Sequence, residues 1–395
     1  MTATRNAARF LTPLLHALFF VAAATQSAIV PLLPRLNHTY HLTPSADALL
    51  LAAPGLATLA ISLPAGALAD RLGARRLTIA ATILMAIAAL AQAAPSYPLL
   101  MAGRLAFGLA YGIAWTTGVA WLSGTQTKAG SPSLGAVATS AAVGMVAGPA
   151  IGGVLADGFG LSSPFLSVAA MSTILAVALH RQPPEQALLE ATRQPTLRDF
   201  ALVVRQPGVL TAAAVLAIGG AIGGVTQLLV PLQLHQAGFS ASATGLAFSG
   251  AAGLYIAVSA LTVRAGHRAT TARAATLAGL ALALSPLPAT FHAGAVALIG
   301  VLLLTTAPRA VVSTVAYPLA TNSAAQAELG DGLVIGLLNG TWATGLVLAP
   351  LLAGALDQIA GPGAAYLAAI VPGVLAILVL RRLSRVEARR ALQVV

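Results

Sequence analysis

The stretch "GALADRLGARR", residues 66–76, places one acid and three arginines between two long apolar runs. Only 8% of the 395 residues are charged, whereas 58% are hydrophobic and the mean hydropathy is +0.87. A soluble globular chain is typically about half apolar and about a quarter charged. So much apolar surface cannot be hidden in one water-soluble core. The sequence therefore predicts a chain that crosses a bilayer many times, with this charged stretch at a membrane surface.

Apolar runs long enough to span a bilayer, about 20 residues, recur on both sides of this stretch. Six precede a polar segment and six follow it, which predicts an all-α membrane protein with 12 transmembrane helices. The expected parts are an N-terminal six-helix bundle at 1–180, a cytoplasmic linker at 181–206, and a C-terminal six-helix bundle with a basic cytoplasmic tail at 207–395. The runs are about 10–34, 46–65, 77–94, 97–122, 134–156, 164–180, 207–234, 242–263, 274–289, 293–318, 332–356 and 364–380.

Basic residues orient these helices. Eighteen of the 21 lysines and arginines fall in tails or loops that lie inside if the N-terminus is cytoplasmic. Arg35 falls in an outside loop, and Arg104 and Arg309 fall within helices. Short basic loops resist translocation, so we expect both termini in the cytoplasm and the protein in the plasma (inner) membrane. The net charge of +11 then reflects membrane topology. We expect the basic residues to meet anionic lipid headgroups and not nucleic acid.

The two halves of the chain resemble each other. "TQSAIVPLL" from Thr25 compares with "TQLLVPLQ" from Thr226, and "GMVAGPAIGG" from Gly144 with "GLVLAPLLAG" from Gly345, both at an offset of 201 residues. "ALADRLGARR" from Ala67 compares with "ALTVRAGHRA" from Ala260 at an offset of 193. Repeated halves are typical of secondary transporters whose substrate site lies at the interface of the repeats. The repeat predicts two pseudo-symmetric bundles that rock around a central cavity.

The opening stretch resembles the cytoplasmic loop signature of the major facilitator superfamily, between helices 2 and 3. The resemblance implies a latch in which Asp70 pairs with an arginine or faces the positive end of a helix in the other half. The alternative is a positive-inside loop whose arginines only meet anionic headgroups. In the second half Val263 stands where Asp70 would. The matching residues are Gly66, Leu68, Asp70, Arg71, Gly73, Arg75 and Arg76.

The segment "GMVAGPAIGG", 144–153, in helix 5 resembles the antiporter signature of the drug:proton exporters in that superfamily. Gly144, Gly148 and Gly152 lie four residues apart and form a ridge for close helix packing, and Gly153 completes the match. Pro149 removes one helical hydrogen bond and bends the helix. The resemblance implies an efflux-type gate, and the alternative is ordinary membrane packing.

Two arginines are expected inside the membrane. In "GRLAFGLAYG", 103–112, Arg104 resembles the helix-4 arginine of the same exporters and shares a face with Gly108 and Gly112. An arginine within a spanning helix costs about 2.5–3.5 kcal/mol on insertion scales, so it should face water or a partner. Arg104 could instead snorkel to the outer interface. Arg309 in helix 10 matches no family motif and could bind an anionic group or reach the inner interface.

The sequence departs from these exporters in its acids. They carry an Asp or Glu within the first helices, whereas the run at 10–34 has none and all ten acids fall at helix ends, loops or tails. His16, of a residue type that titrates near neutral pH, is one candidate proton carrier, although it could be a hydrogen-bonded packing residue. Asp157 and Asp331 are the others. Otherwise transport is uncoupled or exchanges one solute for another.

The expected cavity has few polar or aromatic residues. In this superfamily helices 1, 4, 7 and 10 line the centre, with help from 2, 5, 8 and 11. Gln26 and Gln227 occupy matching positions in the two halves. A largely apolar wall with a few amides and aromatic rings suits an amphipathic or lipophilic solute. The candidates for solute contact are Gln26, Tyr111, Trp115, Gln227, Tyr255, Arg309, Asn339 and Trp342.

We therefore predict a monomeric transporter of the major facilitator fold that works by alternating access. The leading function is export of small lipophilic or amphipathic, drug-like compounds in exchange for protons. The alternatives are an anion or organic-acid permease or exchanger that uses Arg104 and Arg309, and a sugar efflux transporter. The sequence has no cysteine, no HExxH, no nucleophile elbow and no nucleotide-binding loop. Accordingly we expect no enzyme activity, no metal and no cofactor.

Overall fold

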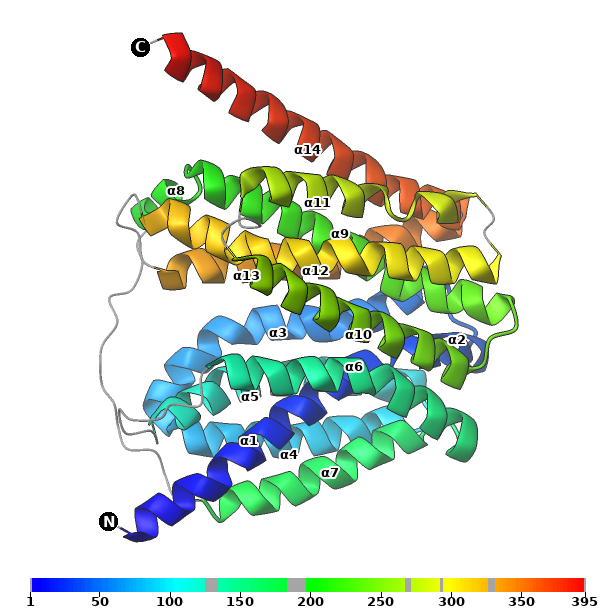
Figure 1. The fold of residues 1–395 in the computed structure, drawn as a ribbon. Helices are drawn as coiled ribbons and strands as arrows, with labels where there is room; N and C mark the ends of the chain where they lie inside the picture. Colours follow the sequence, from blue (N-terminus) through cyan, green and yellow to red (C-terminus); the bar gives the residue numbers. More distant parts are fainter. Residues whose placement is uncertain are drawn as a thin grey trace. The chain divides into compact units, whose positions relative to one another are not determined.

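The computed structural model is helical throughout the residues that it describes, which are 2–124, 134–182, 197–266, 271–291, 294–325 and 331–393 (Figure 1). The first half of the sequence forms α1 (Thr2–Ala28), η1 (Val30–Leu32), α2 (Leu33–Tyr40), α3 (Pro44–Leu72), α4 (Ala74–Ala93), α5 (Tyr97–Gly124), α6 (Leu134–Phe159) and α7 (Ser163–His180). The second half forms α8 (Leu197–Val203), α9 (Pro207–Gln236), α10 (Ala241–Ala265), α11 (Ala272–Leu284), η3 (Leu287–Thr290), α12 (Ala295–Ala325), α13 (Asp331–Ala360) and α14 (Pro362–Gln393).

The predicted number of spanning helices is confirmed. Within the described ranges, 12 segments are long and apolar enough to cross a membrane, and each overlaps one predicted run. The first segment is longer than predicted and extends over Phe10–Tyr40. Arg35 therefore lies in α2 and not in a loop. The chain stays helical there because Pro31 and Pro34 stand at the starts of η1 and α2, where proline fits without losing a hydrogen bond.

The charged stretch at 66–76 is not the loop that the sequence predicted. α3 continues to Leu72 and α4 begins at Ala74, so Gly73 is the one residue between the two helices. Gly73 has φ 88°, a conformation that side-chain-bearing residues rarely adopt. A single glycine is thus enough to turn the chain, and the basic residues lie in the last turn of α3 and the first turn of α4.

The helices form two compact units. The first unit contains Met1–Leu42, Leu49–Ala191 and Gly238–Gly250, and the second contains Thr43–Ala48, Thr192–Ala237 and Ala251–Val395. Two helices consequently run from one unit into the other. α3 begins in the second unit and continues in the first, whereas α10 begins in the first unit and continues in the second.

Each unit has its own apolar core. In the first unit α1 packs along α6 and α4 along α5, around side chains that include Phe19, Phe107 and Trp121. In the second unit α9 packs along α12 and α13, around Val215 and Val315. In a bilayer such packing relies on close van der Waals contact, because lipid tails are as apolar as the helices.

Candidate functional site

The glycines of the predicted antiporter segment lie in the first unit, on the face of α6 that packs against α1. A Cβ added at Gly152 would lie 2.6 Å from the carbonyl oxygen of Ala28, closer than real Cβ atoms come. Gly144 and Gly148 meet the α1 backbone in the same way. The two helices can approach this closely only because those three positions carry no side chain. The opposing α1 residues are Phe20, Ala24 and Ala28.

The opposite side of the same segment packs against the start of α10, also within the first unit. A Cβ at Gly153 would collide with the backbone of Ala241, and one at Gly245 would collide with the Pro149 carbonyl. The Ala150 N–H donates a hydrogen bond to Ser249 Oγ at 3.0 Å. α6 is therefore held between α1 and the first turns of α10.

His16 lies on the seam between α1 and α6. Its Nδ1 is 2.6 Å from Ser140 Oγ, and the side chain is half-buried. Ser140 stands four residues before Gly144, and His16 stands four residues before Phe20. Residues four apart share one helix face, so the imidazole lies in line with the glycine ridge.

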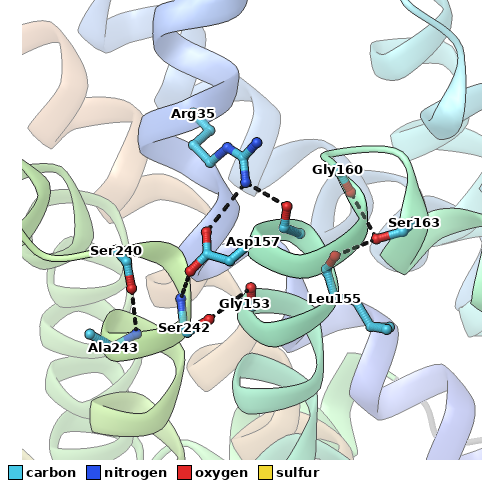
Figure 2. A network of polar contacts seen from close by, with 10 residues as sticks. Arg35, Gly153, Leu155, Asp157, Gly160, Ser163, Ser240, Ser242 and Ala243 are labelled. Atoms are coloured by element: carbon cyan, nitrogen blue, oxygen red, sulfur yellow. Dashed lines mark hydrogen bonds and ion pairs between the residues drawn. The ribbon is translucent and has the colours of Figure 1, made fainter.

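At the far end of α6, Asp157 joins three segments of the first unit (Figure 2). One carboxylate oxygen accepts the Ser242 N–H at 2.7 Å, and the other lies 3.3 Å from Arg35 Nη1. Arg35 also donates to the Ala156 carbonyl at 2.6 Å, and Ser242 Oγ donates to the Gly153 carbonyl at 3.3 Å. A carboxylate beside unpaired N–H groups at a helix start is favourable. We call these five residues the Asp157 junction.

A similar arrangement occurs in the second unit, between the end of α13 and the start of α3. Ser45 Oγ donates to Gln358 Oε1 at 2.8 Å. A Cβ at Gly354 would lie 2.5 Å from the Pro44 carbonyl oxygen and 2.6 Å from the Ala48 Cβ. These residues, Pro44, Ser45, Ala48, Gly354 and Gln358, form the Gln358 junction.

The helix-4 segment is a packing face toward α3. A Cβ at Gly108 would meet Pro54, and one at Gly112 would meet Ile61. Arg104 has 0% exposure, its Nε donates to the Leu50 carbonyl at 3.0 Å, and its guanidinium lies over the Phe107 ring, 5.9 Å from the centroid. Within the described residues its terminal nitrogens have no hydrogen-bond partner. The side chain is enclosed and does not reach the interface in this structure.

Of the residues in the charged stretch, Arg75 has the clearest contacts. Its Nε and Nη2 donate to the carbonyls of Gln182 and His180, at 2.8 and 2.5 Å, and so cap the end of α7 within the first unit. Arg71 and Arg76 are exposed, and no atom lies within 4 Å of a Cβ built at Gly66. The side chains of Asp70 and Asp331 lie outside the described part of the structure.

The expected cavity residues fall into separate groups. In the first unit Tyr111 stacks on Trp115 with 6.1 Å between ring centroids, and Phe19 meets Trp115 edge-on at 5.1 Å. Gln26 is half-buried on α1. In the second unit Tyr317 donates to Asn339 Oδ1 at 2.5 Å. Two further candidates there, Gln227 and Trp342, are half-buried.

Arg309 and Tyr255 come together in the second unit. The guanidinium carbon lies 5.5 Å from the centroid of the Tyr255 ring, within cation–π range. A Cβ at Gly223 would lie 3.0 Å from Arg309 Nη1. The guanidinium on α12 therefore lies against both α9 and α10.

The sequence from residue 15 to residue 332 matches the profile of one protein family, the Major Facilitator Superfamily. The match covers well over half of the chain. The chain belongs to the Major Facilitator Superfamily. Proteins of this superfamily are transporters and are generally not enzymes.

Two fungal members of the superfamily match part of the sequence. The MFS-type transporter ppzB of Metarhizium rileyi is 30% identical over 125 residues, and that of Metarhizium majus is 29% identical over 153 residues. The matches cover 31% and 37% of this chain, and 25% and 34% of the relatives. The aligned part thus spans about a third or less of the curated relatives.

Solved structures of other transporters share the fold over nearly the whole chain. A bacterial homologue of the human lysosomal transporter Spinster, inward-facing and unoccupied, has a TM-score of 0.72 at 16% identity, covering 95% of this chain and 94% of the other. A variant of the nucleoside transporter NupG has a TM-score of 0.72 at 14% identity, covering 94% and 99%. At these identities the similarity shows the fold alone.

Several contact residues of this superfamily member escaped the sequence analysis. Arg35, Ser45, Ser242 and Gln358 stand at helix ends and belong to no recognised motif. The available signal was the repeat, since Ser45 and Asp157 in the first half correspond to Ser242 and Gln358 in the second, at offsets of 197 and 201 residues. Asp47 was also missed, because an acid in the first turn of α3 looks solvated, yet it has 0% exposure. In the described residues no three potential metal ligands come together.

Proposed function

We propose that this Major Facilitator Superfamily member is a secondary transporter that moves small amphipathic organic solutes by alternating access. It acts as a monomer in the plasma membrane, with both termini in the cytoplasm, and exports its solute in exchange for protons. The family membership supports transport. The nucleoside transporter among the structural neighbours moves a small organic solute and has the same fold, which is consistent with this solute class.

Alternating access requires helix ends that can separate and meet again. The Asp157 and Gln358 junctions have the composition for this role. Each buries glycines against backbone and adds only one to a few polar contacts near an exposed surface. Such contacts are individually weak. In the proposed cycle the start of α10 leaves α6, and the start of α3 leaves α13.

The observation that carries proton exchange is the position of His16 on the α1–α6 seam. A neutral imidazole can accept the Ser140 hydroxyl proton at Nδ1, whereas a protonated ring only donates. Proton binding therefore changes the hydrogen bond at one end of the seam, and the same helix carries Asp157 at its other end. His16 is accordingly our proposed proton carrier, ahead of Asp157 and Asp331.

Proteoliposomes that contain a trapped pH-sensitive dye test this proposal. Three naphthalene solutes of matched size are supplied outside or inside: naphthalenesulfonate, naphthalenesulfonamide and naphthylmethyl-trimethylammonium. We expect at least one to move protons in the opposite direction through the wild type. His16→Gln should exchange the solute without moving protons, and His38→Gln, at an exposed histidine of α2, should match the wild type.

Two results would contradict the proposal. If none of the three solutes exchanges across the membrane, the proposed solute class is wrong. If His16→Gln still couples solute to protons, His16 is not the carrier and Asp157 becomes the residue to test.

A further inference from the structure

Arg309 lies near the middle of a spanning helix. Fourteen residues of α12 precede it and 16 follow it. At about 1.5 Å per residue, it lies roughly 20 Å along the axis from either end. The helix is longer than the hydrocarbon core, which is about 30 Å thick. If the helix is centred, a residue near its middle lies roughly 15 Å from the headgroups, still long for a side chain to reach by snorkelling. A charge at such a position calls for a compensating partner.

The structure provides no acid for this charge. Of the described residues, none forms a hydrogen bond or ion pair with the Arg309 guanidinium, whose one polar-type contact is the Tyr255 ring. Other arginines in or near the helices have hydrogen-bond acceptors or an acid beside them. Arg35 meets Asp157, and Arg75 meets the carbonyls of His180 and Gln182 at and just after the end of α7.

Arg104 is the natural comparison, because it too lacks an acid within hydrogen-bond distance among the described residues. It has 0% exposure, however, and glycine packing closes its surroundings. Nothing can reach it from outside without moving helices. Arg309 is only half-buried and so remains open to a ligand.

The neighbours of Arg309 leave most of its hydrogen-bond donors without a protein acceptor among the described residues. The guanidinium carbon lies over the Tyr255 ring, and a guanidinium has five N–H donors in its plane. The missing side chain at Gly223 lets Nη1 approach the α9 backbone. One helical turn further along α9, on the same face, stands Gln227. Gln227 is half-buried, and its amide has no hydrogen bond to any residue that the structure describes.

We propose that Arg309, with Tyr255 and Gln227, binds the anionic group of an amphipathic organic solute. The guanidinium edge takes a carboxylate, sulfonate or phosphate in a two-pronged contact. Tyr255 and the surrounding apolar helix faces accept the apolar body of the solute. The inference rests on the proposed transport function and specifies its solute class as organic anions.

Equilibrium binding of radiolabelled naphthalenesulfonate to the full chain in nanodiscs tests this site without requiring transport. We expect saturable binding to the wild type and little binding of the matched sulfonamide. Arg309→Gln should weaken binding about 10- to 100-fold, in line with loss of a charged hydrogen bond. Arg309→Lys keeps the charge but loses the planar pair of N–H donors, so its affinity for the sulfonate should lie between those of the wild type and Arg309→Gln. Arg264→Gln, at an exposed arginine in the last turn of α10, should match the wild type.

Gln227→Ala and Tyr255→Leu keep the proposal testable if Arg309→Gln does not fold, and each should weaken binding several-fold. Equal binding of sulfonate and sulfonamide, or affinity for the sulfonate unchanged in these variants, would overturn the site. Binding in nanodiscs with and without phosphatidylglycerol distinguishes a site for an organic solute from a site for an anionic lipid headgroup. Loss of sulfonate binding in the anionic lipid would make this a headgroup site. Absence of transport with intact, Arg309-dependent binding would refute the transport proposal and leave the anion site standing.

Discussion

At the Asp157 junction a carboxylate of α6 accepts a backbone N–H at the start of α10, and an arginine lies beside it. At the Gln358 junction an uncharged amide of α13 accepts a hydroxyl at the start of α3. A side-chain hydroxyl caps both helix starts. The Ala243 N–H donates to Ser240 Oγ, and the Ala46 N–H donates to Thr43 Oγ1. The two units thus keep one packing arrangement, and a carboxylate accepts the helix-start hydrogen bond in only one of them. We therefore expect packing to hold both junctions, and pH and salt to act more strongly on the first.

The largest effects are expected from Gly153→Ala and Gly354→Ala, which test the packing that the junctions share. The added methyl meets backbone in both cases, of Ala241 and of Pro44. We expect each change to weaken its own junction by about 1–3 kcal/mol, as overpacking typically does. Pairs of spin labels measure the distance between the two helix ends of each junction. Because the chain has no cysteine of its own, the labels can be attached at introduced cysteines.

Suitable label positions within one unit are the exposed Phe159 with Leu246 for the first junction, and the exposed Ile359 with Thr43 for the second. Gly158→Ala is the control, because no atom lies within 4 Å of a Cβ at that position. Distances in Gly153→Ala that match those of Gly158→Ala would show that close packing does not hold the junction.

Asp157→Asn tests the difference between the junctions. It keeps an acceptor for Ser242 and removes the charge, so we expect the first junction to weaken by about 1 kcal/mol. In the wild type, acidification that protonates Asp157 should lengthen the Phe159–Leu246 distance, and in Asp157→Asn that pH response should vanish. The Ile359–Thr43 distance should respond less than this in both proteins.

The reciprocal change, Gln358→Glu, transfers a carboxylate to the second junction and should create a pH response there. If the second junction remains insensitive to pH, a carboxylate beside a helix start is not sufficient. The Arg35 contact would then be the required part.

Arg35→Gln should have the smallest effect, about 0–1 kcal/mol, because the two side chains of the ion pair are 37% and 31% exposed. The effect on the first junction should fade as salt is added. A loss that persists at high salt would instead assign the role of Arg35 to its hydrogen bond with the Ala156 carbonyl.

The sequence predicted what depends on local composition. Twelve apolar segments stand out because each is long enough to span a bilayer by itself. The glycines of α6 were also recognisable, since their four-residue spacing places them on one face. The turn at Gly73 was mistaken for a loop because charge marks a membrane surface but does not end a helix.

The junctions could not be predicted in the same way. Ser242 and Asp157 are 85 residues apart, and Ser45 and Gln358 are 313 residues apart. Hydropathy reports which segments are apolar and not which helix ends meet. Arg104 and Asp47 illustrate the same gap, because their enclosure depends on neighbouring helices that no local pattern identifies.

The passage of α3 and α10 between the two units has a consequence for how the protein is made. A membrane protein is inserted from its N-terminus as the ribosome delivers each segment. When the first six spanning segments have emerged, the partner of Gly153 and Pro149 on α6 has not yet been synthesised. Lipid must cover that surface until the start of α10 arrives to displace it. The first unit therefore gains this contact only after synthesis of the second half has begun.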